Sequence, residues 1–118
     1  MADVHAMLGK ELFVIITTAA VDPTSKEYQE TLPAHLDHQV RLEKEGIMFA
    51  AGPMMTEDGK RRGLIVIRAG SYDEARKIAD RDPYHKSGLR TYTVEKWTVN
   101  EGTYSVRVNY SDQSMTIE

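Results

Sequence analysis

Four runs of apolar, β-branched and aromatic residues along the chain predict four β-strands. They cover residues 11–18, 47–54, 63–69 and 90–99. The first run has almost no polar interruption, which is typical of a strand with both faces covered. A polar loop with Asp58 and Gly59 separates the second and third runs, and this dipeptide favours a hairpin between them.

The segment between the first two strands predicts a helix over residues 25–45. Proline lacks an N–H group and disrupts a helix interior, so Pro33 predicts a short turn first and a main helix from about residue 33. Leu32, Leu36 and Val40 form the centre of its apolar stripe, which we expect to be buried. Gly46 is the expected C-terminal stop.

A second helix is predicted after the third strand. Ser71 and Glu74 have the spacing of a capping box, in which the serine caps the helix and the glutamate lies at its third position. The helix presents one small apolar face, made of Ala75, Ile78 and Ala79. It is expected to end before Pro83, because a residue that precedes proline avoids the helical region.

The resulting order is β-α-β-β-α-β, which defines an α+β fold of the ferredoxin-like, split βαβ type. It has one antiparallel sheet with both helices on one face. Since the first strand is apolar on both sides, the other sheet face is expected to meet a second sheet. A dimer with two sheets face to face is the simplest arrangement, so a homodimer or higher homo-oligomer is predicted.

A segment of about 19 residues follows the fourth strand. Tyrosine and valine alternate with polar residues over residues 104–110, which predicts an extra strand at the edge of the sheet or crossing to a partner. Residues 111–118 are weakly apolar, and an ordered arm or a tail both fit. We therefore interpret residues 1–118 as one domain, with a core of about 10–99 and a C-terminal extension over 100–118.

Composition narrows the functional classes. The 15 Lys and Arg against 18 Asp and Glu give a net charge of −3, which argues against nucleic acid as a partner. The chain has no cysteine, so disulfides, thiolate metal sites and a cysteine nucleophile are excluded. No apolar run could span a bilayer and no secretory signal is recognisable, so a cytoplasmic protein with no membrane partner is expected.

His35 is the first candidate for chemistry, because it lies at the rim of the predicted apolar stripe. A partly buried imidazole at a cleft can act as a base near neutral pH, whereas a boundary histidine can also simply bind a backbone carbonyl. His38 points away from the stripe and is expected to be solvated. The two histidines form an H-x-x-H pair, but without cysteine or an acidic ligand at a familiar spacing no metal site is predicted.

Asp82 is the second candidate. It precedes Pro83 and could cap the next turn. In a split βαβ fold its loop can also approach the first helix, where a carboxylate would fix the tautomer of His35. Gly52 and Pro53 end the second strand and could let a ligand approach the backbone closely. Tyr84 is a candidate ligand contact or a core residue, and the run Lys60, Arg61 and Arg62 is interpreted as a solvated loop.

Several motifs, in order, resemble the YciI-like (YCII-related) family. They are Pro-Ala-His-Leu at 33–36, Glu-Gly at 45–46, Ala-Gly-Pro at 51–53, Asp-Gly at 58–59, the helix start at 71–75, Asp-Pro-Tyr at 82–84, and Val94 with Trp97. The resemblance spans about residues 12–99, whereas residues 102–118 exceed it.

This resemblance implies a dimeric α+β barrel with a histidine–aspartate pair in a cleft, here His35 and Asp82. Characterised members of the superfamily include muconolactone isomerases, chloromuconolactone dehalogenases and a dehydrochlorinase of chlorinated hydroxyquinol, which work without a cofactor. The expected activity is therefore a cofactor-free lyase that removes HCl from a small aromatic or lactone substrate. His35 would be its base, Asp82 would orient His35, and Gly52, Pro53 and Tyr84 would contact substrate. A muconolactone-type isomerase and a non-enzymatic ligand-binding or assembly module are the alternatives.

Overall fold

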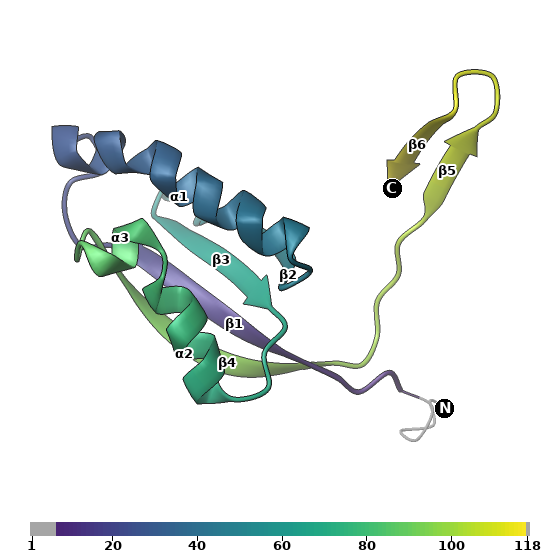
Figure 1. Ribbon diagram of the computed structural model, residues 1–118, viewed down its shortest axis with the longest axis horizontal. Helices are drawn as coiled ribbons and strands as arrows, with labels where there is room; N and C mark the ends of the chain where they lie inside the picture. The colour runs from purple at the N-terminus through teal and green to yellow at the C-terminus, as the bar shows by residue number, and fades with distance from the viewer. Residues whose placement is uncertain (1–6, 118) are drawn as a thin grey trace. The chain divides into compact units, whose positions relative to one another are not determined.

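The computed structural model describes residues 7–117. These residues divide into two compact units, one formed by Glu11–Thr98 and the other by the segments before and after it. The elements, labelled in Figure 1, are β1 (Lys10–Ala19), α1 (Lys26–Lys44), β2 (Met48–Met55), β3 (Arg61–Ile67), α2 (Tyr72–Asp80), α3 (Pro83–Lys86), β4 (Arg90–Val99), β5 (Val106–Asn109) and β6 (Ser114–Ile117).

The large unit contains a four-stranded sheet in the order β2-β3-β1-β4. Strand β3 runs antiparallel to both of its neighbours, β1 and β2, with Phe13 opposite Ile67 and Ala51 opposite Ile65. This is the strand order of the split βαβ arrangement, and the predicted α+β fold with an antiparallel sheet is confirmed. The loop with Asp58 and Gly59 joins β2 to β3 as a hairpin.

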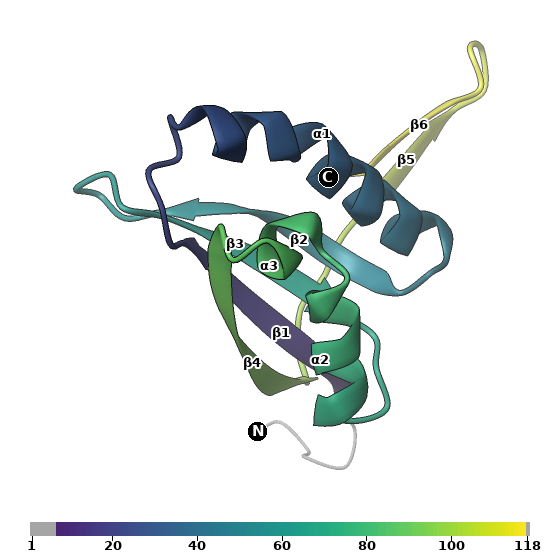
Figure 2. The same ribbon diagram turned by 60° about the vertical axis from the view of Figure 1, so that its left-hand side comes forward.

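The core lies on one face of this sheet. Because side chains alternate along a strand, Phe13 and Ile15 of β1 share a face with Ile65 and Ile67 of β3. The helical residues that complete this cluster are Leu42, Ala75, Ile78 and Ala79. Helices α1, α2 and α3 therefore lie on the same side of the sheet, as Figures 1 and 2 show.

Helix α1 is continuous through Pro33, so the predicted break at this residue is wrong. Tertiary contacts on both sides of the proline explain the continuity. The ring of Tyr84 stacks on Tyr28 before the proline, with 4.5 Å between ring centroids, and lies 4.8 Å from the ring of His35 after it. The Tyr84 hydroxyl also donates to the backbone carbonyl of Tyr28 at 3.0 Å. These contacts offset the backbone hydrogen bond that proline cannot make.

The ends of α1 follow the local signals. Ser25 caps its first turn by accepting from the Tyr28 N–H group. At the other end Gly46 has a φ of +74°, and the N–H groups of Gly46 and Ile47 donate to the carbonyls of Glu43 and Leu42. This is the Schellman arrangement that a left-handed glycine permits, as the sequence predicted.

The face that α1 buries differs from the prediction. Leu32, Leu36 and Val40 are 42%, 51% and 46% exposed, whereas His35 and Leu42 are buried. The apolar stripe was expected to be the packed face. The helix instead turns its histidine face toward α3, since His35 meets Asp82 and Tyr84 there.

Helix α2 begins as predicted, with Ser71 Oγ accepting from the Glu74 N–H group at 3.1 Å. The Glu74 carboxylate reaches back to the N–H group of Gly70 at 2.8 Å, one residue earlier than in a standard capping box. The short helix α3 was not predicted. Asp82 is its N-cap and Pro83 its first residue, a position that suits proline.

The C-terminal segment forms a hairpin of its own. Strand β5 pairs only with β6 among the described strands, so an extra strand at the edge of the main sheet is excluded, whereas a strand that crosses to a partner stays a prediction. The predicted alternating segment does form a strand, β5. Its partner β6 comes from residues 111–118, for which the sequence allowed either an ordered arm or a tail. None of the helices within residues 7–117 is long and apolar enough to cross a membrane.

We expect Pro33→Ala to raise the free energy of unfolding by about 1–3 kcal/mol, because the variant restores a helical N–H group at an exposed interior position. Urea denaturation followed by circular dichroism measures the change. Pro23→Ala, in the loop before the helix, is the matched control and should change stability by less than about 1 kcal/mol. A destabilised Pro33→Ala variant would contradict the account of α1.

Candidate active site

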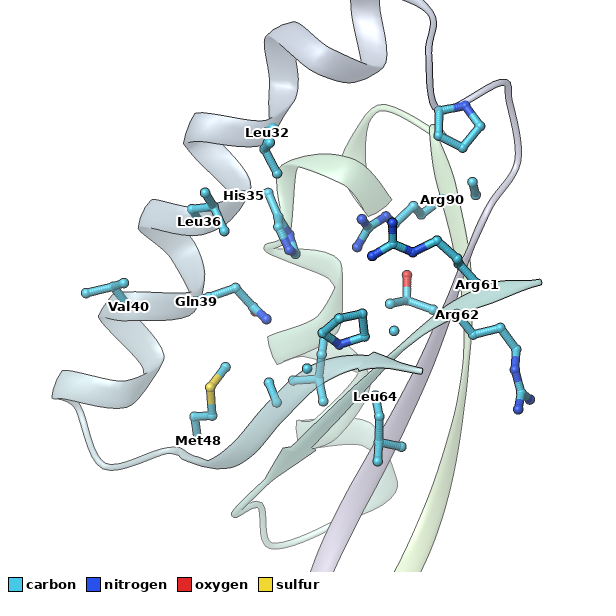
Figure 3. Close-up of a pocket in the computed structure, with 18 of the residues that line it drawn as sticks. Leu32, His35, Leu36, Gln39, Val40, Met48, Arg61, Arg62, Leu64 and Arg90 are labelled. Atoms are coloured by element: carbon cyan, nitrogen blue, oxygen red, sulfur yellow. The ribbon is translucent and has the colours of Figure 1, made fainter. Parts of the chain in front are cut away.

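A cleft of about 610 Å³ lies between α1 and the ends of the central strands. Its apolar lining includes Leu32, Leu36, Val40, Met48, Pro53, Leu64 and Ile65. Its polar lining includes His35 and Gln39 from the helix and Arg61 and Arg90 from the strands. Figure 3 shows these side chains converging from the two walls.

His35 and Asp82 form a buried pair beside this cleft. His35 Nδ1 lies 2.8 Å and 3.0 Å from the two carboxylate oxygens of Asp82. The two residues are only 7% and 1% exposed, so the pair is shielded from bulk water. Such a short contact in a low-dielectric site orients the imidazole ring strongly.

The carboxylate of Asp82 is fully used by its neighbours. Oδ1 also accepts from the Tyr84 N–H group at 2.9 Å, which is the helix cap described above. Burial raises the pKa of Asp82. The hydrogen bond and charge of His35, together with the hydrogen bond from the Tyr84 N–H group, lower it by more, so the pKa lies below its ordinary value of 3.8. Asp82 is therefore ionised at neutral pH and can only accept hydrogen bonds.

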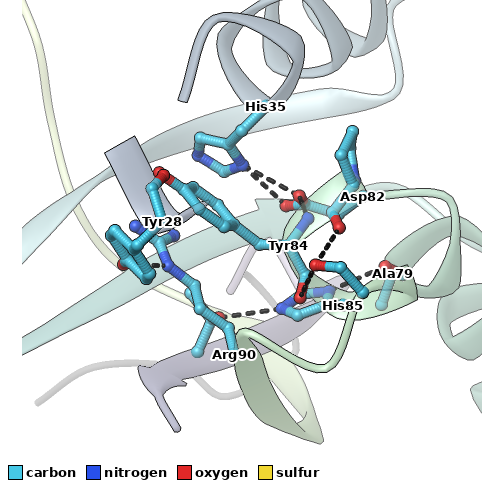
Figure 4. A network of polar contacts seen from close by, with 10 residues as sticks. Tyr28, His35, Ala79, Asp82, Tyr84, His85 and Arg90 are labelled. Carbon is cyan, nitrogen blue, oxygen red and sulfur yellow. Dashed lines mark hydrogen bonds and ion pairs between the residues drawn. The ribbon is translucent and has the colours of Figure 1, made fainter. Parts of the chain in front are cut away.

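The ionised carboxylate decides the tautomer of His35. Nδ1 must carry the proton that is donated to Asp82, which leaves Nε2 with a free lone pair. Residues 7–117 provide no hydrogen bond to Nε2. This nitrogen is turned away from Asp82 (Figure 4), and His35 lines the cleft, so the arrangement can accept a proton from a bound molecule.

A layer of aromatic and basic side chains supports the pair from behind (Figure 4). The guanidinium group of Arg90 lies 4.2 Å from the centre of the Tyr84 ring, and its Nε donates to the Tyr28 hydroxyl at 2.6 Å. Burial and the neighbouring Tyr28 raise the pKa of Tyr84, so its hydroxyl stays protonated and donates to the helix backbone.

His85 anchors α3 to the sheet. Its Nδ1 donates to the carbonyl of Ala79 at 2.7 Å, so its Nε2 accepts from the Thr17 hydroxyl at 2.8 Å. Thr17 lies opposite Gly63 in the sheet, and a Cβ at Gly63 would be only 2.6 Å from the Thr17 methyl group. The glycine thus allows the close approach of β3 and β1 beneath the site.

The structure brings together part of the predicted site. Gly52 and Pro53 line the cleft with His35. Tyr84, expected to contact substrate, is instead fully buried and is not part of the cleft lining; it packs against His35. Asp82 also lies behind His35 and reaches the cleft only through it.

His38 was expected to be solvated but is half-buried, and it lines a second, shallower cleft with Arg41 and Arg81. Burial lowers the pKa of His38 below 6.5; the charge of Asp82 opposes this shift, and the charge of Arg81 adds to it. Within residues 7–117 no group of three histidine, aspartate or glutamate side chains is arranged to hold a metal ion.

Sequence analysis missed three polar residues of the site. Arg90 and Tyr28 carried no motif, and Gln39 has a buried Oε1 without a hydrogen-bond partner among the described residues. The only available signal was helical spacing, since Gln39 is four positions after His35 and shares its face. Arg61 was interpreted as part of a loop, but it begins β3 and points into the cleft.

The sheet topology and the His35–Asp82 pair together define a ferredoxin-like α+β domain with a histidine–aspartate site beside a cleft. The model of the YCII-related domain matches residues 12–98, and the chain belongs to this family. It is 36% identical over 66 residues to the "derivative of benzaldehyde biosynthesis cluster protein C" of Emericella nidulans, a match that covers 49% of this chain and 67% of that protein. It is 32% identical over 78 residues to the uncharacterized protein YjpA of Bacillus subtilis, covering 66% and 88% of the two chains.

A solved structure shares the fold. It is the 5-chloro-2-hydroxyhydroquinone dehydrochlorinase of Burkholderia phenoliruptrix AC1100, in complex with 2,5-dihydroxybenzoquinone. The TM-score is 0.58 at 24% identity, and the match covers 73% of this chain and 92% of that one. At this identity the likeness is one of fold.

Asp82→Asn should lower the free energy of unfolding at pH 7 by about 3 kcal/mol, because it removes one partner of a buried pair. Since the folded-state pKa of Asp82 is below 3.8, its contribution is complete above that pH and is lost as the pH falls through the folded-state value. The wild type should therefore lose stability more steeply than the variant below pH 3.8. Chemical denaturation across this pH range makes the comparison, and equal slopes for the two proteins would contradict it.

Gln39→Met should raise the free energy of unfolding by about 1 kcal/mol, because the variant keeps the volume but removes a buried oxygen without a partner. Thermal denaturation measures this. Gln29→Met, on an exposed turn of the same helix, is the control and should have little effect. A destabilised Gln39→Met variant would mean that the amide has a partner in solution.

Proposed function

We propose that this protein is an acid–base enzyme that acts on a small hydroxylated ring, with His35 as its base. The observation that carries the proposal is the buried His35–Asp82 pair, whose open Nε2 lies at a cleft of about 610 Å³. That volume suits a single-ring substrate. Because the base is a side chain, the proton transfers themselves require no cofactor.

Two further observations support an aromatic-derived substrate. The chain is 36% identical over 66 residues to a protein named for benzaldehyde-derivative biosynthesis, and it shares its fold with a dehydrochlorinase of a chlorinated trihydroxybenzene. The cleft combines apolar side chains, which suit a ring, with polar groups that suit its oxygen atoms. We therefore choose the loss of HCl from a chlorinated hydroxyquinol as the specific reaction.

The proposed reaction has two proton transfers. In the first, Nε2 accepts the proton of the hydroxyl beside the C–Cl bond and returns it to the chlorine-bearing carbon, which gives a keto tautomer. In the second, Nε2 accepts the proton of the hydroxyl across the ring. The O–H electron pair then forms a second carbonyl, the ring double bond shifts, and chloride leaves with the electrons of the C–Cl bond. The products are a hydroxyquinone, a proton and chloride.

The neighbours of His35 have separate tasks in this proposal. Asp82 is a positioning residue, because it fixes the tautomer and stabilises the imidazolium ion that each transfer forms. Gly52 and Pro53 were expected to end the second strand but lie within β2, which continues to Met55. Both are exposed at the cleft, where they let the flat ring approach the backbone. The same base can catalyse the first transfer alone, in which case the product is an isomer and no chloride is released.

His35→Ala should lower turnover of a chlorinated hydroxyquinol by about 10²–10⁴-fold, because it removes the base. Chloride release and product mass are measured together for the purified wild type and the variant. His38→Ala is the matched control, since it removes a histidine from the next turn of the same helix that is not part of the cleft lining. It should retain turnover.

Three results would count against the proposal. Full chloride release by His35→Ala would exclude His35 as the base. A product of unchanged mass without chloride would establish an isomerase in place of a lyase. No turnover by the wild type, with binding of the hydroxyquinol intact, would leave the ligand-binding module as the better description.

A further inference from the structure

Two arginines beside His35 carry positive charges that no carboxylate neutralises within the described chain. Arg61 and Arg90 both line the cleft, and neither forms an ion pair with any of residues 7–117. Figure 3 shows their guanidinium groups on the strand side of the cleft, across from His35 on the helix. Two positive charges in one cleft repel each other, and a bound anion would offset this repulsion.

Arg90 is held in place by its neighbours. Its guanidinium group lies over the Tyr84 ring, 4.2 Å from the centroid, and 5.4 Å from the centroid of Tyr28. One nitrogen, Nε, is occupied by the Tyr28 hydroxyl. The two terminal nitrogens keep their donors available, and a guanidinium that is already ordered loses little freedom when it binds an anion.

The position of Arg61 follows from strand alternation. Arg61, Gly63 and Ile65 share one face of β3, which is the face that packs under α1, and all three line the cleft. Arg62 also lines the cleft, but it belongs to the opposite face of β3, and in Figure 3 its side chain extends away from the guanidinium groups of Arg61 and Arg90. The two adjacent arginines thus differ in their relation to the site although they carry the same charge.

The local charge contrasts with that of the whole chain, which has a net charge of −3. The acidic residue of the cleft lining is Glu43, eight positions after His35 and therefore about 12 Å further along the helix axis. The end of the cleft beside His35 is positive, whereas the wall formed by Leu32, Leu36 and Val40 is apolar. A positive end inside a low-dielectric cleft attracts anions selectively.

We propose that the cleft selects ring compounds that carry an anionic oxygen group, which Arg61 and Arg90 bind while the ring lies on the apolar wall of α1. The group is a carboxylate or an ionised phenol oxygen. This inference rests on the proposed function for the identity of the site and specifies its substrate class. A bound anion beside His35 also places the ring hydroxyl within reach of Nε2.

Binding of non-reacting probes tests this inference without any turnover. 4-Hydroxybenzoate and its neutral counterpart 4-hydroxybenzyl alcohol are titrated into wild-type protein and followed by NMR chemical shifts. The wild type should bind the carboxylate more tightly by about tenfold, and added salt should reduce this preference. 4-Nitrophenol distinguishes the second anion source, because its ionised form absorbs visible light and binding should increase the ionised fraction.

Matched variants locate the charge. Arg61→Gln should lose most of the preference for the carboxylate, whereas Arg62→Gln, which removes the same charge one residue later, should keep it. Arg61→Lys retains the charge and should keep most of the preference for the carboxylate. This variant separates the loss of charge from a loss of folded structure. Arg90→Gln should lose the preference as well, with thermal denaturation as the check on its packing role.

Equal binding of the charged and neutral probes by the wild type would overturn the inference, as would no binding of the carboxylate or the nitrophenol. An equal loss in Arg61→Gln and Arg62→Gln would also overturn it. Because the probes do not react, the binding results are independent of the chloride assay. Anion selectivity without chloride release would keep the binding site and reject only the proposed reaction.

Discussion

A single buried carboxylate determines the arrangement of this domain. Asp82 is 1% exposed and ionised, so its oxygens must be satisfied by donors from the protein. One donor is the Tyr84 N–H group, which begins α3, and the other is His35 Nδ1 in the middle of α1. The carboxylate therefore joins two helices that are far apart in the sequence. The same contact that joins the helices also fixes the tautomer of His35, so the fold and the candidate chemistry depend on one interaction.

The cleft is a consequence of this attachment. Helix α1 turns the face with His35 toward α3, so the face with Leu32, Leu36 and Val40 is not buried against the sheet. The space between this second face and the strands is the cleft. Tyr84 makes the attachment rigid by contacting α1 on both sides of Pro33. Several locally unfavourable features are gathered here. They are a proline within a helix and, as far as residues 7–117 show, a buried amide oxygen without a partner and two arginines without a carboxylate. Such features are typical of a binding site, where a ligand supplies what the protein lacks.

Local patterns were sufficient for most of the fold. The four strands, α2 with its serine cap and the glycine stop of α1 depend on neighbours within a few residues, and the prediction agreed with the structure there. The prediction of a break at Pro33 was wrong because the contacts that keep α1 continuous come from Tyr84, more than fifty residues later. His35 was a candidate because of its place at the rim of the predicted apolar stripe, Asp82 because it precedes Pro83, and the family resemblance then paired them. Both interpretations of Asp82 hold, since it caps a helix and also binds the histidine.

By itself the sequence determined the order of the elements, the antiparallel sheet and the residue types available for chemistry, because these follow from periodicity and local hydrogen bonding. Only the tertiary structure decided which face of α1 is buried, since a helix with an apolar stripe and a histidine can pack through either. It also decided that Arg61 and Arg90 line the same cleft as His35, and that residues 106–117 form a separate hairpin. These outcomes depend on contacts between distant segments, such as the 47 positions that separate His35 from Asp82, and periodicity along the chain carries no information about such contacts.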